Sequence, residues 1–140
     1  MFDDFLPQFK EAVSLAKNYE DAYLEELKKG LHPISTHASV REDNPDEKLA
    51  SSILNKELVK LLNSFDFEAV KILQVLMYLG RDRDYDRREV PETVYKEHRM
   101  LLNSGGWKSQ EIEVNQMTSL IPFGTFLEQG FEILGIPILK

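Results

Sequence analysis

The chain has 140 residues, of which 42% are apolar and 29% are charged, the balance of an ordinary soluble globular domain. A chain of this length buries roughly two thirds of its unfolded surface, so we expect a single domain, residues 1–140, whose core needs no disulfides or metal. There is no cysteine, which excludes disulfide frameworks, thiol nucleophiles and cysteine-ligated metal centres and fits a reducing cytoplasm.

The charge is negative and unevenly distributed. The formal net charge is −7; residues 1–70 hold 8 basic and 14 acidic side chains, and residues 71–140 hold 9 and 10. Nucleic-acid-binding proteins gather Lys and Arg to neutralise phosphates, so this distribution argues against nucleic acid and favours a basic protein partner. The start lacks the basic and apolar parts of an export signal, and no apolar stretch approaches the roughly 20 residues of a membrane span. We therefore expect a cytoplasmic protein without a membrane role.

The first predicted helix is long and amphipathic. Pro7 is at its start, Gly30 follows its end, and about 23 residues lie between the two signals. One face is apolar at steps of three and four residues, as a helix requires: Phe9, Ala12, Ala16, Tyr19, Tyr23 and Leu27.

Residues 31–44 show no sustained period and predict a long loop. Asn44 is a suitable N-cap for a second helix over about 45–63. A third helix is expected from Phe67 to Leu79, capped by Asp66 and ended by Gly80 in a left-handed conformation. Only three residues inside this third helix are polar, and they are spaced by three: Glu68, Lys71 and Gln74.

Three more helices are predicted in the second half. One begins at Pro91 and ends at Ser104, and a short one follows Ser109, although alternation over 111–114 also fits a strand. The last begins at Pro122 and ends at Gly135. The predicted fold is all-α, an orthogonal bundle of five or six helices with one long loop, in which the third and last helices are the most buried.

The sequence Tyr78-Leu79-Gly80-Arg81-Asp82 lies after the apolar helix and before Leu120-Ile121-Pro122 and Leu127-Glu128-Gln129-Gly130. With these stretches, residues 66–135 resemble a small bacterial family catalogued only as a domain of unknown function. The resemblance implies a Leu-Gly-Arg-Asp-like turn after a hydrophobic helix and a C-terminal helix entered through a proline-containing segment. It implies no activity, cofactor or catalytic residue, and it favours a bacterial cytosolic origin.

The charge run that follows the third helix resembles a calcium loop in one respect only. Asp82, Asp84 and Asp86 alternate, as do the first ligands of that loop. The sixth position is Arg87 where glycine is needed, and the twelfth is Thr93 where a bidentate glutamate is needed. A loop of paired or solvated charges is the better interpretation.

Arg81 supports a different hypothesis, an anion site. The guanidinium group matches carboxylate and phosphate geometry, and Arg81 directly follows the most apolar helix. Asp82 or Asp84 would orient it, and Trp107 would be available for stacking. We place such a ligand pocket between the charged turn and the C-terminal helices.

The histidines and the glycine pair have simpler structural explanations. His98 is on the apolar side of its helix without a visible nucleophile, so a boundary histidine is favoured over a general base. His32 and His37 lack further ligands of zinc spacing. Gly105-Gly106 ends a helix and does not follow a strand as a phosphate loop does. We expect no metal and no cofactor.

The first helix offers a candidate surface for a protein partner. Tyr19 and Tyr23 are flanked by acids, including Glu20 and Glu26, and tyrosine beside charge is common at interfaces. Packing of the same residues inside the bundle is the competing interpretation. A further alternative is pairing with the same helix of a second chain, which would give a homodimer.

Two functional hypotheses follow. The first is a non-enzymatic protein-binding or regulatory module, similar to an immunity protein, that covers a basic partner. The second is a small-molecule or nucleotide-binding protein with its anion site at Arg81. No catalytic motif is present, so the sequence favours a role without catalysis.

Overall fold

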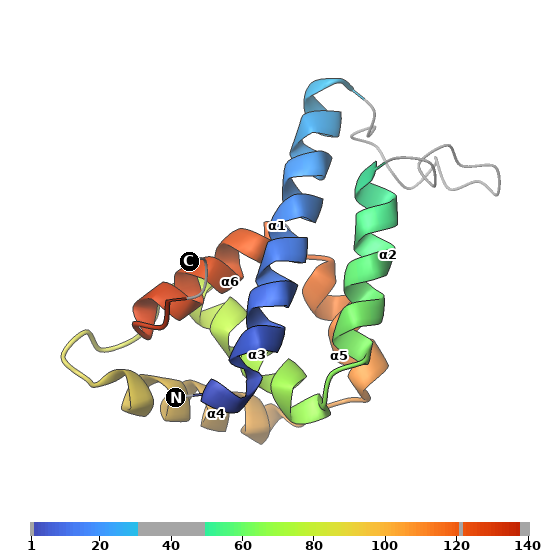
Figure 1. Cartoon of the computed structure of the whole chain (residues 1–140). Helices are drawn as coiled ribbons and strands as arrows, with labels where there is room; N and C mark the ends of the chain where they lie inside the picture. Colours follow the sequence, from blue (N-terminus) through green and yellow to red (C-terminus); the bar gives the residue numbers. More distant parts are fainter. Residues whose placement is uncertain (1, 31–49, 121, 138–140) are drawn as a thin grey trace.

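The computed structural model describes residues 2–30, 50–120 and 122–137, which form an all-α bundle (Figure 1). The predicted loop 31–44, the predicted helix start at Asn44 and residues 45–49 lie outside the described residues. The described elements are a short 3₁₀ turn η1 (Asp3–Phe5) and six α-helices: α1 (Leu6–Lys28), α2 (Ala50–Asn63), α3 (Phe67–Asp82), α4 (Pro91–Gly105), α5 (Gln110–Thr118) and α6 (Phe123–Ile133).

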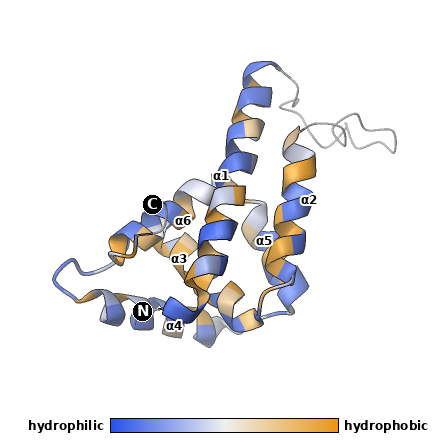
Figure 2. Cartoon of the chain, in the orientation of Figure 1, coloured by the Kyte–Doolittle hydropathy of each residue, from blue (hydrophilic) through white to orange (hydrophobic). Residues whose placement is uncertain are grey.

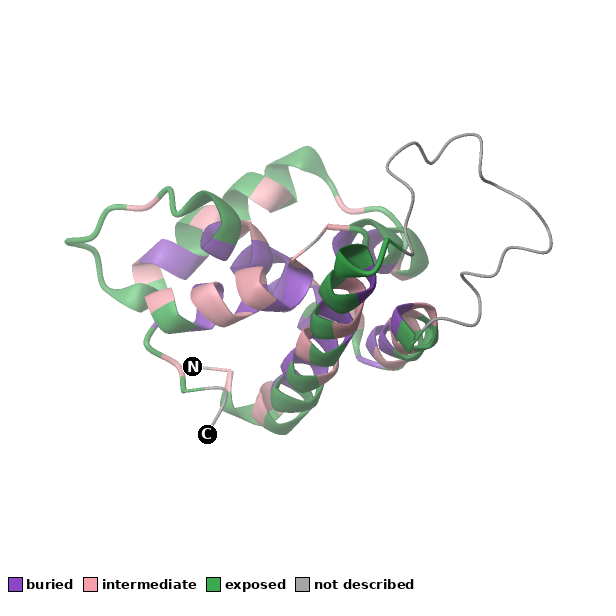
Figure 3. Cartoon of the chain, turned by 90° about the horizontal axis from the view of Figure 1, so that it is seen from above, coloured by how far each residue is buried: buried purple, intermediate pink, exposed green. Residues whose placement is uncertain are grey.

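Helices α1 and α2 lie side by side, and their far ends extend beyond the other four helices (Figure 1). The predicted first helix is confirmed, because α1 has 23 residues with proline in its first turn, and Gly30 follows in the left-handed conformation. Its inward face is buried and its outward face exposed (Figure 3). Figure 2 shows apolar and polar colour alternating along α1. Both patterns arise because apolar residues recur with the helical period in the sequence.

Helix α3 is the centre of the core, as predicted. Ten of its 16 residues are buried, and its longest shared surface is with α6. The buried apolar side chains of the described helices form one cluster, whose largest fully buried members include Phe9, Phe123, Phe131 and Leu73. The prediction that the last helix is also well buried agrees with this contact.

The predicted end of the third helix at Gly80 is wrong. Helix α3 continues to Asp82, and Arg83, with φ 53°, is the left-handed residue that ends it. Gly80 instead lies where α3 crosses α6. A Cβ on Gly80 would be 2.0 Å from the carbonyl oxygen of Phe126. A Cβ on Gly130 would be 2.1 Å from the carbonyl oxygen of Leu76. The two glycines allow the helix backbones to touch.

The other predicted boundaries that fall on described residues agree with the structure within one to three residues. Helix α4 begins at Pro91 and ends at Gly105, and α6 follows its N-cap Pro122. The segment after Ser109 is the helix α5 and not a strand, and the Ser109 hydroxyl accepts a hydrogen bond from the Ile112 N–H at 3.3 Å. Asp66 is the N-cap residue of α3, but its side chain makes no capping hydrogen bond. Among the described helices, none is both long and apolar enough to cross a membrane.

Candidate functional site

A pocket of about 430 Å³ opens between the C-terminal half of α3, the C-terminal half of α4 and α5. Such a volume is within the range of small-molecule sites. Its apolar wall comes from aliphatic and aromatic side chains of these elements: Val75, Tyr78, Leu101, Leu102 and Trp107. Polar side chains complete the lining: Gln74, Arg81, Asp82, Asp84, His98, Lys108, Glu113 and Gln116.

All four predicted ligand-binding residues, Arg81, Asp82, Asp84 and Trp107, line this pocket. The Arg81 guanidinium donates two hydrogen bonds to the Asp82 carboxylate, from Nε at 2.9 Å and from Nη2 at 3.3 Å, and it lies 4.8 Å from the centre of the Tyr78 ring. The hydrogen bond to Asp82 raises the pKa of Arg81. The charge that was predicted to hold an anion is therefore already paired inside the chain.

Gln74, which the sequence analysis did not select, is the most unusual polar group in the lining. Its side chain is 4% exposed, and its Oε1 atom has no hydrogen-bond partner among the described residues. Most buried polar side-chain atoms in native proteins have a partner. The sequence contained a signal, because Gln74 is the last of the three regularly spaced polar residues on α3.

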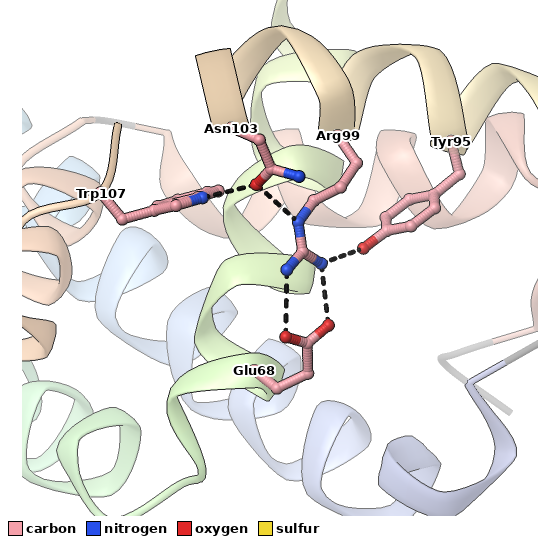
Figure 4. A network of polar contacts seen from close by, with 5 residues as sticks. All are labelled: Glu68, Tyr95, Arg99, Asn103 and Trp107. Carbon is pink, nitrogen blue, oxygen red and sulfur yellow. Dashed lines mark hydrogen bonds and ion pairs between the residues drawn. The ribbon is translucent and has the colours of Figure 1, made fainter. Parts of the chain in front are cut away.

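A polar network holds Trp107 in the pocket wall (Figure 4). Arg99 on α4 donates two bonds to Glu68 on α3, at 2.9 and 3.0 Å, and further bonds to the Tyr95 hydroxyl and to the Asn103 side-chain oxygen. The same Asn103 oxygen accepts the indole N–H of Trp107 at 2.7 Å. Three of these residues are four apart on α4, which is a signal of a shared helix face that sequence reasoning missed.

The charges of this network change the titration of its members. The hydrogen bond from Arg99 lowers the pKa of Glu68, and the hydrogen bond to Glu68 raises the pKa of Arg99. Burial raises the pKa of Tyr95 despite its contact with Arg99. The pair joins α4 to α3 beside the pocket, with Arg99 at 18% and Glu68 at 54% side-chain exposure.

His98 and Glu113 occupy defined positions in the lining. The His98 Nδ1 atom is 3.0 Å from the Val94 carbonyl oxygen, so Nδ1 carries the proton and donates it. A general base would need a hydrogen bond between its other ring nitrogen, Nε2, and a nucleophile. The described residues provide no such bond to His98. Glu113 is 5% exposed and accepts the backbone N–H of Lys108 at 2.8 Å, which fixes the turn between α4 and α5.

The residues predicted to bind a protein partner are packed within the chain. Tyr19 is 8% exposed and its ring is 6.3 Å from that of Tyr23. Glu20 accepts hydrogen bonds from the backbone N–H and the hydroxyl of Thr125 on α6, and Glu26 accepts them from Ser51 on α2. These contacts correspond to the competing interpretation, in which the face stabilises the bundle.

The acidic run offers no cluster of metal ligands. Asp86 is bound by Arg88, whose backbone N–H and guanidinium both donate to it, and this pairing lowers the pKa of Asp86. In the ranges 2–30, 50–120 and 122–137, no three His, Asp or Glu side chains are placed to hold one metal ion. His32 and His37 lie outside the described residues.

The fold and the site together define the class: an all-α bundle with a lined pocket between its central helix and the α4–α5 pair. Comparison of the sequence with protein-family models, with curated proteins and with solved structures finds no match. The resemblance of residues 66–135 to a family of unknown function stays a prediction.

Proposed function

We propose that the protein binds a small molecule in the pocket between α3, α4 and α5. The observation that carries the proposal is the Gln74 amide, which lines the pocket, is 4% exposed and leaves Oε1 without a partner among the described residues. An unsatisfied buried polar group costs about 1–3 kcal/mol, and a ligand that hydrogen-bonds to the amide recovers this cost on binding. The energetic defect of the free protein is then a source of affinity.

We propose that the pocket binds its ligand and does not catalyse a reaction on it. The lining holds His98 but no serine, threonine or cysteine that this histidine would activate. Trp107 and the two leucines of α4 supply apolar surface, which is the usual main component of a ligand site. Absence of cysteine fits a reducing compartment, and we include a cytoplasmic location in the proposal.

A screen of small metabolites against the purified protein tests this function. A ligand present at 100 times its Kd stabilises the folded state by about 2.7 kcal/mol, which a thermal-shift assay detects easily. Trp107 is the chain's single tryptophan and lines the pocket, so its fluorescence reports binding at this place. Gln74→Met should reduce the shift, whereas Gln8→Met, an exposed glutamine on α1, should leave it unchanged. Shifts that are equal in all three proteins would place the ligand elsewhere.

Binding of a basic protein partner is the second candidate. The net charge of −7 supports it, as does an exposed apolar pair on α4, Met100 at 68% and Leu101 at 70% exposure. Affinity capture from lysate with a salt gradient tests it, because screening weakens attraction between complementary charges. If a partner stays bound equally well as salt is added, the electrostatic part of this proposal is contradicted. A homodimer through α1 would be seen in the same preparation by sedimentation.

A further inference from the structure

The chemistry of the pocket lining restricts the class of ligand, an argument that rests on the proposed binding function. The Gln74 side chain is a primary amide with a carbonyl acceptor and an NH₂ donor. No hydrogen bond joins this amide to another described residue, so it can turn toward a ligand without breaking a bond inside the protein. Its complement is an edge with one donor and one acceptor side by side. Glutamine recognises adenine in this way, through N6 and N7.

The charged residues of the lining disfavour an anion. Three carboxylates, from Asp82, Asp84 and Glu113, face the pocket against two cations, Arg81 and Lys108. Arg81 is bound through two hydrogen bonds to Asp82. A phosphate placed here would share Arg81 with Asp82 and would lie near the carboxylates of the lining, and both effects weaken its binding.

The aromatic wall supplies apolar contact to the ligand. The one polar atom of Trp107, the indole nitrogen, already donates to Asn103 at 2.7 Å. Lys71 and Arg99 lie over part of the Trp107 ring, at 5.5 and 5.8 Å from its centre, and the part that lines the pocket offers apolar surface. Arg99 also fixes the Asn103 oxygen that holds the indole. Leu101 and Leu102 extend this surface along α4. A flat ring is the ligand shape that gains most from an aromatic wall, since stacking on a side chain contributes to binding of every base.

From these three observations we infer that the ligand is an uncharged flat nitrogen heterocycle with adjacent hydrogen-bond donor and acceptor, such as an aminopurine base or nucleoside, and not a nucleotide. The amide of Gln74 pairs with the polar edge, Trp107 and the leucines cover the ring, and the three carboxylates of the lining outnumber its two cations, which disfavours a phosphate. This assignment replaces the anion site that the sequence predicted at Arg81.

Adenosine and two compounds that each differ from it in one feature test the inference. Purine riboside lacks the amino donor, and adenosine 5′-monophosphate adds a phosphate. Binding is measured by Trp107 fluorescence and by ¹⁵N resonances of the pocket residues. We expect adenosine to bind about tenfold more tightly than purine riboside, because a good two-bond pairing discriminates by this order. We expect the monophosphate to bind at least about fivefold more weakly than adenosine, with a difference that decreases as salt is added.

Two variants separate the pairing from the fold. Gln74→Met should bind adenosine and purine riboside equally, while Gln8→Met on the surface of α1 should keep the tenfold difference. A monophosphate that binds more tightly than adenosine would overturn the inference, and so would equal binding of the two nucleosides to the unmodified protein. If none of the three purines binds while other fragments shift the pocket resonances, the inference fails and the proposed function stands. If no compound of any class shifts them, the proposed function itself fails.

Discussion

Replacement of Gln74 by methionine is expected to make the ligand-free protein more stable. Most core substitutions destabilise a protein, so an increase is a specific result. The amide is 4% exposed, and its oxygen has no partner in the described part of the chain. Methionine has a similar length and flexibility, and its thioether needs no hydrogen bond, so packing against α4 and α5 is kept and the desolvation cost of the amide is removed.

The magnitude follows from the cost of one unsatisfied polar group, about 1–3 kcal/mol. Methionine and glutamine lose similar side-chain entropy on folding, so that contribution cancels. From the lower part of the range we expect the free energy of unfolding to rise by about 1–2 kcal/mol. For a chain of this size, each kcal/mol changes Tm by about 4 °C, so the expected increase is about 4–8 °C.

Urea titration followed by far-ultraviolet circular dichroism measures the change. The midpoint should rise at an unchanged m value, because the surface exposed on unfolding stays the same. Gln8→Met, on the exposed face of α1, serves as the control and should stay within about 0.5 kcal/mol of the unmodified protein. A loss of about 1 kcal/mol or more in Gln74→Met would show that the amide stabilises the fold, and the reasoning that links it to a ligand would be refuted.

Three further predictions concern the helix contacts around the pocket. Gly80→Ala should lower the free energy of unfolding by about 3 kcal/mol or more, because its Cβ would overlap backbone atoms of α6. Gly105→Ala, which has open space around it, is the control and should be neutral or slightly stabilising in the same denaturant titration. Arg99 lowers the pKa of Glu68, so this carboxylate stabilises the fold above its unfolded pKa of about 4.3 and loses that effect as the pH falls through its lower folded-state value. Glu68→Gln should therefore cost at most about 1 kcal/mol at pH 7, since Glu68 is half exposed, and nothing near pH 2; a cost that is equal at both pH values would contradict the ion pair. Arg99→Lys removes the two-bond contact to Glu68 and the bond to Asn103, so the emission maximum of Trp107 should move to longer wavelength with unchanged helical circular dichroism; an unchanged maximum would show that Trp107 is held by other contacts.

The helices could be predicted from sequence because their signals are local. These signals are proline at the start of α1 and α4, glycine after α1, and an apolar stripe with helical period on each helix. Each can be read without knowing which distant residues pack against it. Gly80 gave the wrong helix end for the opposite reason. A glycine in a helix cap and a glycine at a helix crossing look alike in sequence, and only the position of α6 distinguishes them.

The candidate site was predictable in part. Arg81, Asp82, Asp84 and Trp107 were grouped from the sequence, and all four line one pocket; their role in binding stays a prediction. The pairing of Arg81 with its neighbour depends on side-chain geometry that the sequence does not contain. The pocket was expected between the charged turn and the C-terminal helices, and it lies between α3, α4 and α5.

Two site residues that the sequence predictions did not include, Glu68 and Gln74, belong to one regular polar pattern. Glu68, Lys71 and Gln74 form the polar line on α3. In the structure Glu68 holds Arg99, Lys71 lies 5.5 Å from the centre of the Trp107 ring, and Gln74 lines the pocket. The polar line on an otherwise apolar central helix thus lies on the side that faces the pocket and its polar network.

The crossing at Gly80 and Gly130 predicts different rates of amide hydrogen exchange for different helices. Amides of α3 and α6 near the crossing lie in the buried core, where the two backbones touch, and should exchange only through global unfolding. Helix α4 has two buried residues, Val94 and Tyr95, so its amides should exchange through local opening at a much lower free energy. We therefore expect the pocket wall that α4 contributes to exchange its amides faster than the α3–α6 pair that forms the core.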